Sequence, residues 1–182
     1  MKLGLALLRA IVGALFMGHG LQKLAGWFGG HGLEATGQAF EGMGLAPGRQ
    51  HATAAGASET LGGALLATGL MTPLGAAMIT GTMATAIRQV HGSNGLWVTE
   101  GGYEYNLVLI AAVFALTDAG PGAWSLDGAR GHEHWGAAWA LAQLVAGVAG
   151  SAVVLSRAQA PAPPPEQAPS PVGSGQADAA AA

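Results

Sequence analysis

The sequence predicts an all-α integral membrane protein, an antiparallel bundle of four core transmembrane helices plus a fifth, C-terminal span. Of the 182 residues, 51% are hydrophobic and only 9% are charged, whereas soluble domains usually carry about 25% charged residues. The apolar residues also fall in long blocks, which is typical of membrane spans. Glycine is abundant, with 31 residues, and small residues let membrane helices pack closely.

The composition also excludes several function classes. The chain has no cysteine, so it contains no disulfide framework, thiol nucleophile or thiolate metal site of its own. The net charge is −3, and the sequence shows no basic stripe. We therefore expect the lipid bilayer, and no nucleic acid, as a partner.

The first apolar run covers residues 3–21 and contains only two ionisable residues, Arg9 and His19. A signal peptide would have a shorter apolar core and a cleavage site of small residues. This run is longer and ends in Gly-His-Gly-Leu-Gln-Lys. We therefore expect a helix that is not cleaved.

A glycine-rich connection follows over residues 26–50. Its apolar residues Leu33, Phe40 and Met43 are spaced roughly as on one face of a helix. The pattern leaves a short interfacial helix and an irregular loop equally open.

Four further apolar runs cover residues 52–71, 74–90, 103–117 and 135–155. Thr72-Pro73 separates the first two by a tight turn, since proline ends one helix and starts the next. The last run is long enough to span a membrane at about 1.5 Å per residue. We divide the chain into a four-helix membrane domain (1–127), an extra transmembrane helix (128–156) and a tail (157–182), whose Ala/Pro-rich composition predicts disorder.

Short connections make successive spans antiparallel, so polar residues from different spans approach the same membrane face. That set consists of His19, Lys23, Glu59, Arg88 and Glu104. We expect no comparable set at the opposite membrane face, where Arg9 is the one charged residue within a span. Charge inside a membrane is costly, and such groups are usually paired or functional. For the whole set we favour a polar pocket for binding or proton transfer, and for Lys23 alone we favour a structural role.

The entry to the fourth span is the most polar stretch, with Tyr103 and Tyr105 on either side of Glu104 and Asn106 next. These side chains can hydrogen-bond a quinone or another carbonyl compound. Tyrosine is also common at membrane interfaces for purely physical reasons. We expect Glu104 to pair with Lys23 or Arg88.

The segment His132-Glu133-His134 is the one possible metal clip. Its two histidines are two residues apart, a spacing that does not place both on one helix face, and no cysteine supports them. We interpret it as a solvated loop and predict no metal site.

Four motifs follow one another along residues 3–127 in a characteristic order. They are Phe16-Met17-Gly18-His19-Gly20 with Lys23-Leu24, Glu59-Thr60-Leu61-Gly62-Gly63 with Gly69, Gly102-Tyr103-Glu104-Tyr105-Asn106-Leu107, and Gly120-Pro121-Gly122 with Ser125-Leu126-Asp127. Together they resemble the DoxX family of small bacterial membrane proteins. The resemblance implies a four-helix bundle similar to the subunits of quinone-linked thiosulfate oxidoreductases. The run at 135–155 departs from that four-span pattern.

Two hypotheses for the function follow. In the first, the chain is an oxidoreductase subunit in thiol, sulfur or oxidative-stress chemistry, with a non-covalently bound quinone. His19 and Glu59 are then the catalytic residues that move protons. The binding residues are Lys23, Arg88, Tyr103, Glu104, Tyr105 and Asn106, and a membrane or extracytoplasmic redox partner supplies electrons. In the second, the chain is a non-catalytic scaffold or small-molecule carrier, and its charges are structural ion pairs.

The expected location is the plasma (inner) membrane, with several passes. The distribution of Lys and Arg weakly favours a cytoplasmic N-terminus. The polar set would then face the outside of the cell.

Overall fold

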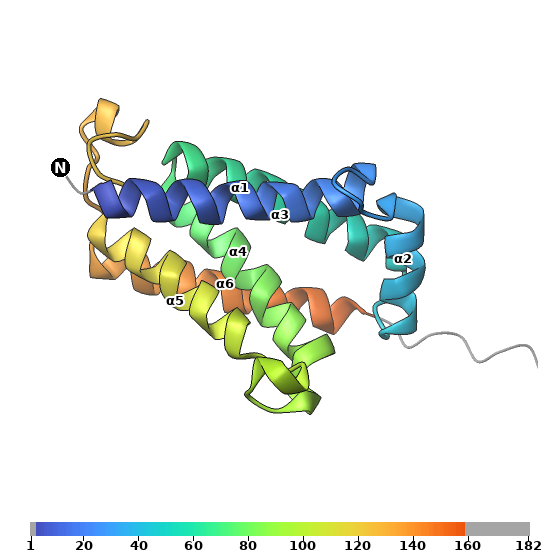
Figure 1. The fold of residues 1–182 in the computed structure, drawn as a ribbon. Helices are drawn as coiled ribbons and strands as arrows, with labels where there is room; N and C mark the ends of the chain where they lie inside the picture. The colour runs from blue at the N-terminus through green and yellow to red at the C-terminus, as the bar shows by residue number, and fades with distance from the viewer. Residues whose placement is uncertain (1–2, 159–182) are drawn as a thin grey trace, which may run out of the picture.

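The computed structural model describes residues 3–158, which form six α-helices and no β-strand (Figure 1). The helices are α1 (Leu3–Ala25), α2 (Gly32–Gly42), α3 (Gly48–Thr68), α4 (Thr72–Ala86), α5 (Glu104–Ala119) and α6 (Ala137–Arg157). A π-helical turn, η1 (Ile87–His91), extends α4, and three short 3-10 turns, η2 (Gly92–Asn94), η3 (Val98–Glu100) and η4 (Gly128–Arg130), lie in loops. The predicted disordered tail lies outside the described residues from position 159 onward.

The predicted apolar runs correspond to α1, α3, α4 with η1, α5 and α6. The short helix that the sequence left open also forms, as α2. It packs on both α1 and α3 and crosses one end of the molecule, which we call the α2 end (Figure 1). This helix closes one end of the space between the longer helices.

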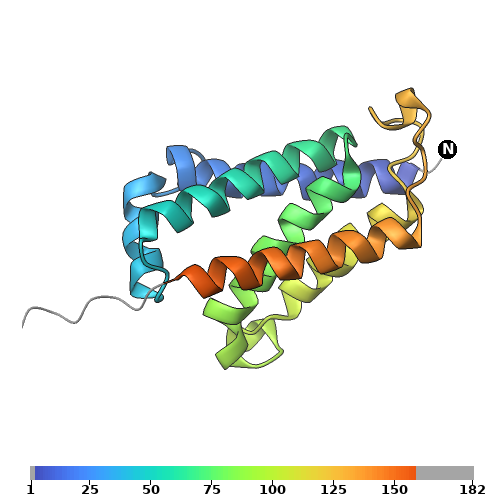
Figure 2. The same cartoon turned by 180° about the vertical axis from the view of Figure 1, so that it is seen from behind.

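The central element is α4, which packs against α3, α5 and α6 (Figure 2). The helix predicted as an extra span, α6, packs along α4 and also contacts α5, so it is an integral part of the helix packing. Two polar contacts join it to α4: Thr80 donates to Gln143 (3.0 Å), and the hydroxyls of Thr85 and Ser151 lie 2.9 Å apart. Helix α1 begins at one end of the molecule, and α6 finishes at the other (Figure 1).

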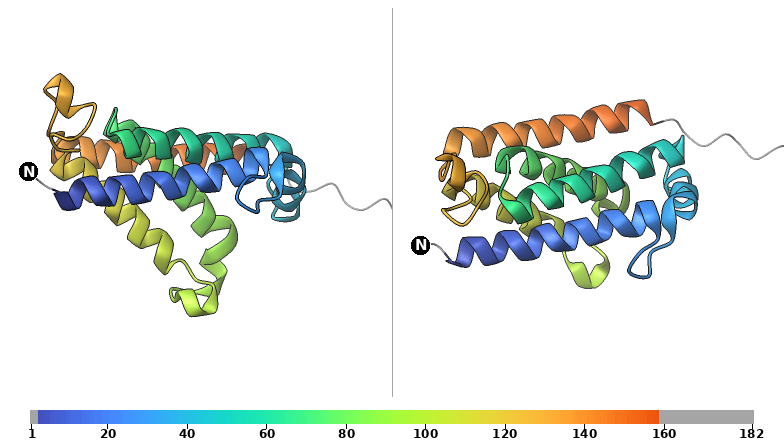
Figure 3. Two further views of the ribbon diagram at one scale, coloured as in Figure 1. Left: turned by 45° about the horizontal axis from the view of Figure 1, so that its top comes forward. Right: turned by 90° about the horizontal axis from the view of Figure 1, so that it is seen from above.

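Helices α1 and α3 run antiparallel and approach unusually closely (Figure 3). A Cβ atom added to Gly63 would lie 2.5 Å from the backbone oxygen of Gly13, and one added to Gly20 would lie 2.5 Å from that of Gly56. Only glycine permits such backbone contact. These contacts fix the register between the two helices, and therefore the depth at which their polar residues meet.

The surface of the long helices is apolar, while several polar side chains are inside. Large exposed side chains include Leu7 and Ile11 on α1 and Leu141 and Val145 on α6. The buried side chains include Glu59, Thr80, Asn106, Thr117 and Gln143. Soluble domains seldom expose apolar patches of this extent.

Two helices, α1 and α6, are long and apolar enough to cross a membrane. Only 28% and 22% of these segments are buried, so most of their apolar surface faces outward. Helix α5 has 16 residues, fewer than the roughly 20 that a span normally needs, and α4 has 15 residues, to which η1 adds 5. The structure therefore supports a helical membrane protein with two candidate spans.

The end opposite α2 contains a second polar cluster, which the sequence analysis did not expect. Arg9 is buried and donates to the backbone oxygens of Pro121 (3.2 Å) and Trp124. Asp127 is also buried and accepts hydrogen bonds from the start of α4. The expectation that only Arg9 would stand out here was wrong, because the loop after α5 folds back and carries Asp127 to the α3–α4 turn.

Candidate functional site

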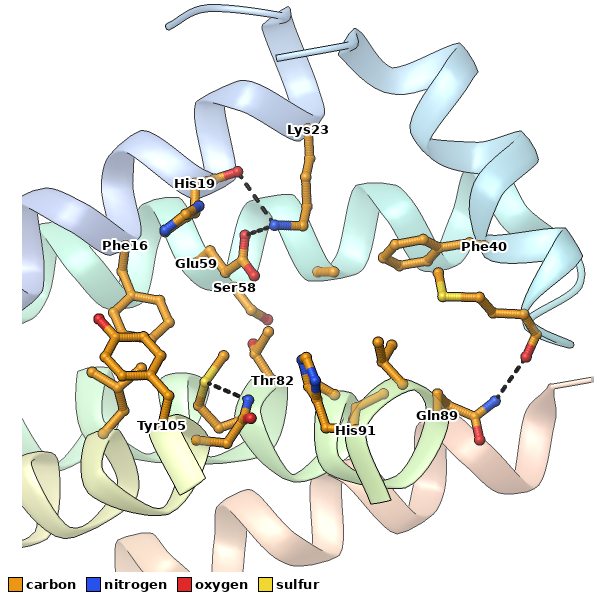
Figure 4. Close-up of a pocket in the computed structure, with 18 of the residues that line it drawn as sticks. Phe16, His19, Lys23, Phe40, Ser58, Glu59, Thr82, Gln89, His91 and Tyr105 are labelled. Carbon is orange, nitrogen blue, oxygen red and sulfur yellow. Dashed lines mark hydrogen bonds and ion pairs between the residues drawn. The ribbon is translucent and has the colours of Figure 1, made fainter. Parts of the chain in front are cut away.

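A partly open cavity of about 430 Å³ lies near the α2 end, between α1 and α3 on one side and α4, η1 and α5 on the other (Figure 4). Its volume falls in the range of small-molecule sites, about 300–1,000 Å³. Much of the wall is apolar, with Phe16, Phe40, Met83 and Leu109 among its residues. A few polar side chains interrupt this wall, as is usual in ligand pockets.

The central polar feature is an ion pair between Lys23 and Glu59, with 2.6 Å between Nζ and Oε2. Glu59 is only 4% exposed. Lys23 Nζ also lies 3.4 Å from the backbone oxygen of His19. It is the only salt bridge among the described residues.

Helix geometry explains how Lys23 reaches Glu59. Gly13 faces Gly63 and Gly20 faces Gly56, so Glu59 is level with Met17, more than a turn deeper than Lys23. Side chains on a helix lean toward its N-terminus. Because α1 and α3 are antiparallel, Lys23 leans inward, Glu59 leans toward the α2 end, and they meet at the cavity wall.

Glu59 keeps one oxygen free for another partner. Lys23 binds Oε2, and no hydrogen bond to Oε1 forms within the described part of the chain. The side chain points into the cavity (Figure 4). A bound molecule can therefore reach a carboxylate oxygen and an ammonium group together.

His19 lines the same cavity, and its ring is oriented by Gln22. Nδ1 lies 3.0 Å from Oε1 of Gln22, whose amide nitrogen donates to the backbone oxygen of Phe28 at 3.2 Å. Since a carbonyl oxygen only accepts, Nδ1 carries a proton. Nε2 remains available for a ligand or a proton.

Two further predicted residues, Tyr105 and Asn106, also line the cavity. Tyr105 is 55% exposed and lies at the rim, whereas Asn106 is buried and its amide contacts the sulfur of Met83 at 3.4 Å. The structure thus brings five predicted residues together: His19, Lys23, Glu59, Tyr105 and Asn106.

Arg88 does not line the cavity, contrary to the expected co-location. It lies in the π-helical turn and is exposed. Gln89, Val90 and His91 of the same turn line the cavity. Arg88 therefore projects from the other side of the turn.

Glu104 and Tyr103 also lie outside the cavity wall. Glu104 accepts a hydrogen bond from the backbone nitrogen of Val98 at 3.0 Å. The expectation that it pairs with Lys23 or Arg88 was wrong. Glu104 instead holds the loop before α5, while the lysine reaches a carboxylate on a helix that packs directly against its own.

Sequence reasoning missed six polar residues of the wall: His51, Ser58, Thr82, Thr85, Gln89 and His91. His91 Nδ1 donates to the backbone oxygen of Gly101 at 2.8 Å, and Gln89 donates to that of Met43 at 3.2 Å. His51 lies between the predicted connection (26–50) and the predicted second span (52–71) and belongs to neither prediction. Its helical spacing to Ser58, two turns later, was the available signal.

The described residues contain no group of three or more His, Cys, Asp or Glu side chains that could hold a metal ion. In the segment considered as a metal clip, His132 stacks on Trp135, with ring centroids 5.6 Å apart. The chemistry available at the cavity is therefore that of an ammonium group, a carboxylate and imidazoles in apolar surroundings. Such a set can bind a carbonyl compound and exchange protons with it.

Residues 4–92 match the family model of DoxX. The chain belongs to the DoxX family. The matched range runs from α1 to η2 and includes both members of the Lys23–Glu59 pair, and it confirms the family suggested by the sequence motifs. This membership and the two apolar helices make it a membrane protein. No curated protein and no solved structure matches the chain.

Proposed function

We propose that this DoxX-family protein binds a quinone in the cavity near the α2 end and acts as a subunit of a membrane oxidoreductase. The observation that carries the proposal is the Lys23–Glu59 pair in the wall of an apolar cavity of about 430 Å³. A quinone head group is a flat, largely apolar ring with opposed carbonyl oxygens. It fits a cavity that offers apolar contact and a few convergent polar groups.

The residues of the cavity have distinct roles in this proposal. When bound, a quinone supplies the capacity to accept two electrons and two protons. Lys23 donates a hydrogen bond to a carbonyl oxygen and stabilises negative charge there. Glu59 and His19 hold and pass protons, and Tyr105 contacts the ligand from the rim. Arg88, Tyr103 and Glu104 no longer belong to the proposed site.

The electrons come, in this proposal, from a membrane or extracytoplasmic partner protein. The molecule lies in the plasma (inner) membrane, with α1, α3, α4, α5 and α6 all crossing it. Support comes from the apolar side chains exposed on these helices and from the exposed Trp27 and Phe28 at the α2 end. Aromatic side chains are enriched at membrane interfaces. With a cytoplasmic N-terminus, the α2 end faces outward.

A second candidate function is a scaffold or carrier in which Lys23 and Glu59 only stabilise the helix packing. The direct 2.6 Å contact between these two side chains favours it. A buried pair is weak evidence for stability, however, because desolvation offsets much of its attraction. Both candidate functions predict that mutation of Lys23 or Glu59 impairs the protein. A measurement of ligand binding is therefore needed to distinguish them.

The test is quinone binding to purified protein in lipid nanodiscs. We expect Glu59→Gln and Lys23→Met each to weaken binding of a short-chain benzoquinone by about tenfold or more, equal to about 1.4 kcal/mol. Arg88→Met is the matched control, since it removes a cation near the α2 end that does not line the cavity, and binding should be unchanged. Wild-type affinity in both cavity variants would rule out this site.

The double variant Lys23→Glu with Glu59→Lys separates the two candidates further. A purely structural pair tolerates the exchange, so stability should return toward the wild-type value. A ligand site does not, because the ammonium group then lies on α3 and deeper in the wall. Restored stability together with lost binding supports the quinone site.

A further inference from the structure

We infer that the ligand of this cavity is a membrane-dissolved molecule with a long apolar tail, and that the tail leaves the protein between α1 and α5. This inference rests on the proposed function, because it concerns the substrate class of the same site. It adds the path by which the ligand enters from the membrane and the apolar tail that the ligand needs for binding.

The cavity wall changes in polarity along its length. Near the α2 end it carries Lys23, His51, Gln89 and His91, together with the apolar side chains of Phe40 and Met43. About two to three turns further from that end along α1 than Lys23, the wall consists of Val12, Leu15 and Phe16. Met83 and Leu109 contribute from α4 and α5, and Asn106 is a buried polar group beside Met83. A ligand that matches both parts has a polar head toward the α2 end and an apolar segment below it.

The apolar part of the cavity opens at the side of the molecule. Leu15 on α1 is 52% exposed and Tyr105 on α5 is 55% exposed, yet both also line the cavity. Val98 and Val90, in the connection that leads into α5, are 56% and 41% exposed and line it too. Residues with both properties mark a rim. Phe16, adjacent to Leu15, is buried and forms the inner wall, so the opening begins directly beside the apolar part of the cavity.

The arrangement of the helices explains this opening. Helix α5 packs mainly against α4 and α6, and α1 and α5 diverge toward the α2 end (Figure 1). Outside the rim, the exposed surface continues with Ile11 and Leu7 on α1 and Val108 on α5. This surface suits lipid and excludes a charged or water-soluble ligand as the natural user of the route.

The absence of cysteine in the natural chain permits a direct test with single-cysteine variants in lipid nanodiscs. Leu15→Cys places a thiol at the rim. Val145→Cys places one on the outer face of α6, where the side chain is 67% exposed and does not line the cavity. The probes are a benzoquinone with a decyl tail, the same head group without the tail, and a lipid-soluble maleimide as labelling reagent.

We expect the decyl compound to bind about tenfold more tightly than the tail-less one after correction for partition into lipid. It should slow maleimide labelling at position 15 and leave position 145 unaffected, whereas the tail-less compound should slow neither. Equal corrected affinities, or unchanged labelling at position 15 under saturating decyl compound, overturn this inference and leave the proposed function standing. Failure of both compounds to bind overturns the proposed function and this inference with it.

Discussion

Replacing Asp127 with alanine is expected to destabilise the protein by at least about 3 kcal/mol, since it leaves several buried donors unpaired. The carboxylate accepts four hydrogen bonds: from the backbone nitrogens of Met71 (2.9 Å) and Thr72 (3.1 Å), the Thr72 hydroxyl (3.1 Å) and the Trp135 indole nitrogen (3.1 Å). Three of these donors, on Met71 and Thr72, are at the start of α4. No cap within that segment's own sequence replaces them.

The same carboxylate matters for Arg9, although the two side chains form no direct ion pair within residues 3–158. The backbone nitrogen of Asp127 donates to Gly69 at 2.8 Å, and Gly69 also packs against the guanidinium of Arg9. Loss of the carboxylate removes the negative charge nearest to a buried cation. Arg9 would then rely on the carbonyls of Pro121 and Trp124 alone.

The measurement is unfolding in a titration of SDS into mild detergent, followed by tryptophan fluorescence. Asp118→Ala is the matched control, because Asp118 is near the same end but exposed and accepts no side-chain hydrogen bond in the described structure. Its unfolding midpoint should stay close to that of the wild type. Equal midpoints for Asp127→Ala and Asp118→Ala would contradict the role assigned to this cluster.

Much of the helix pattern could be predicted from the sequence, because the apolar runs are long and their ends carry clear breakers. Thr72-Pro73 fixed the start of α4, and the polar stretch before Glu104 fixed the start of α5. The packing role of α6 could not be predicted. It depends on contacts such as that between Thr80 and Gln143, whose partners lie 63 positions apart in the chain.

The site was predicted in part, for a reason that is visible in its residues. The antiparallel order of the helices predicts that Lys23, Glu59 and Arg88 lie in one region of the molecule. Hydrophobic periodicity does not predict in which direction each of these side chains points within that region. The rotation of the π-helical turn then directs Arg88 outward and Gln89 inward. Glu104 was misassigned because a local acceptor role, toward Val98 of its own loop, competes with long-range pairing.

The missed Arg9–Asp127 cluster has a related cause. Its carboxylate comes from a loop of irregular structure, where neither a period of 3.6 nor a period of 2 carries information. In the sequence, the motif Ser125-Leu126-Asp127 indicates only a family resemblance. In the structure this motif docks on the α3–α4 turn, where Leu126 N donates to Thr68 O at 3.1 Å.

The close packing of α1 on α3 leads to the second large effect, which is expected for Gly63→Val. A Cβ atom at Gly63 would lie 2.5 Å from Gly13 O and 2.6 Å from Met17 N. Both are backbone atoms, so no side chain can move aside. Overpacking usually costs about 1–3 kcal/mol, and we expect the upper end of that range, measured by the same SDS titration.

Gly18 provides a control on α1 itself, because an added Cβ there has nothing within 4 Å. Gly18→Ala should leave stability unchanged or raise it by a fraction of about 1 kcal/mol, since alanine favours helix over glycine. Gly63→Ala should lower the stability, because its added methyl group meets backbone atoms of α1. The pair of alanine variants therefore tests the direction of the effect with a single methyl group, and destabilisation of equal size at both positions would refute the packing argument.

The effect of Gly63→Val should extend to the cavity. Gly63 lies one turn after Glu59 on α3, and the distance between α1 and α3 decides whether Lys23 reaches that carboxylate. If the helices are forced apart, the 2.6 Å contact lengthens and a charge in an apolar wall loses its partner. We therefore expect weaker quinone binding in Gly63→Val although no residue of the cavity wall has changed, and unaltered binding in Gly18→Ala.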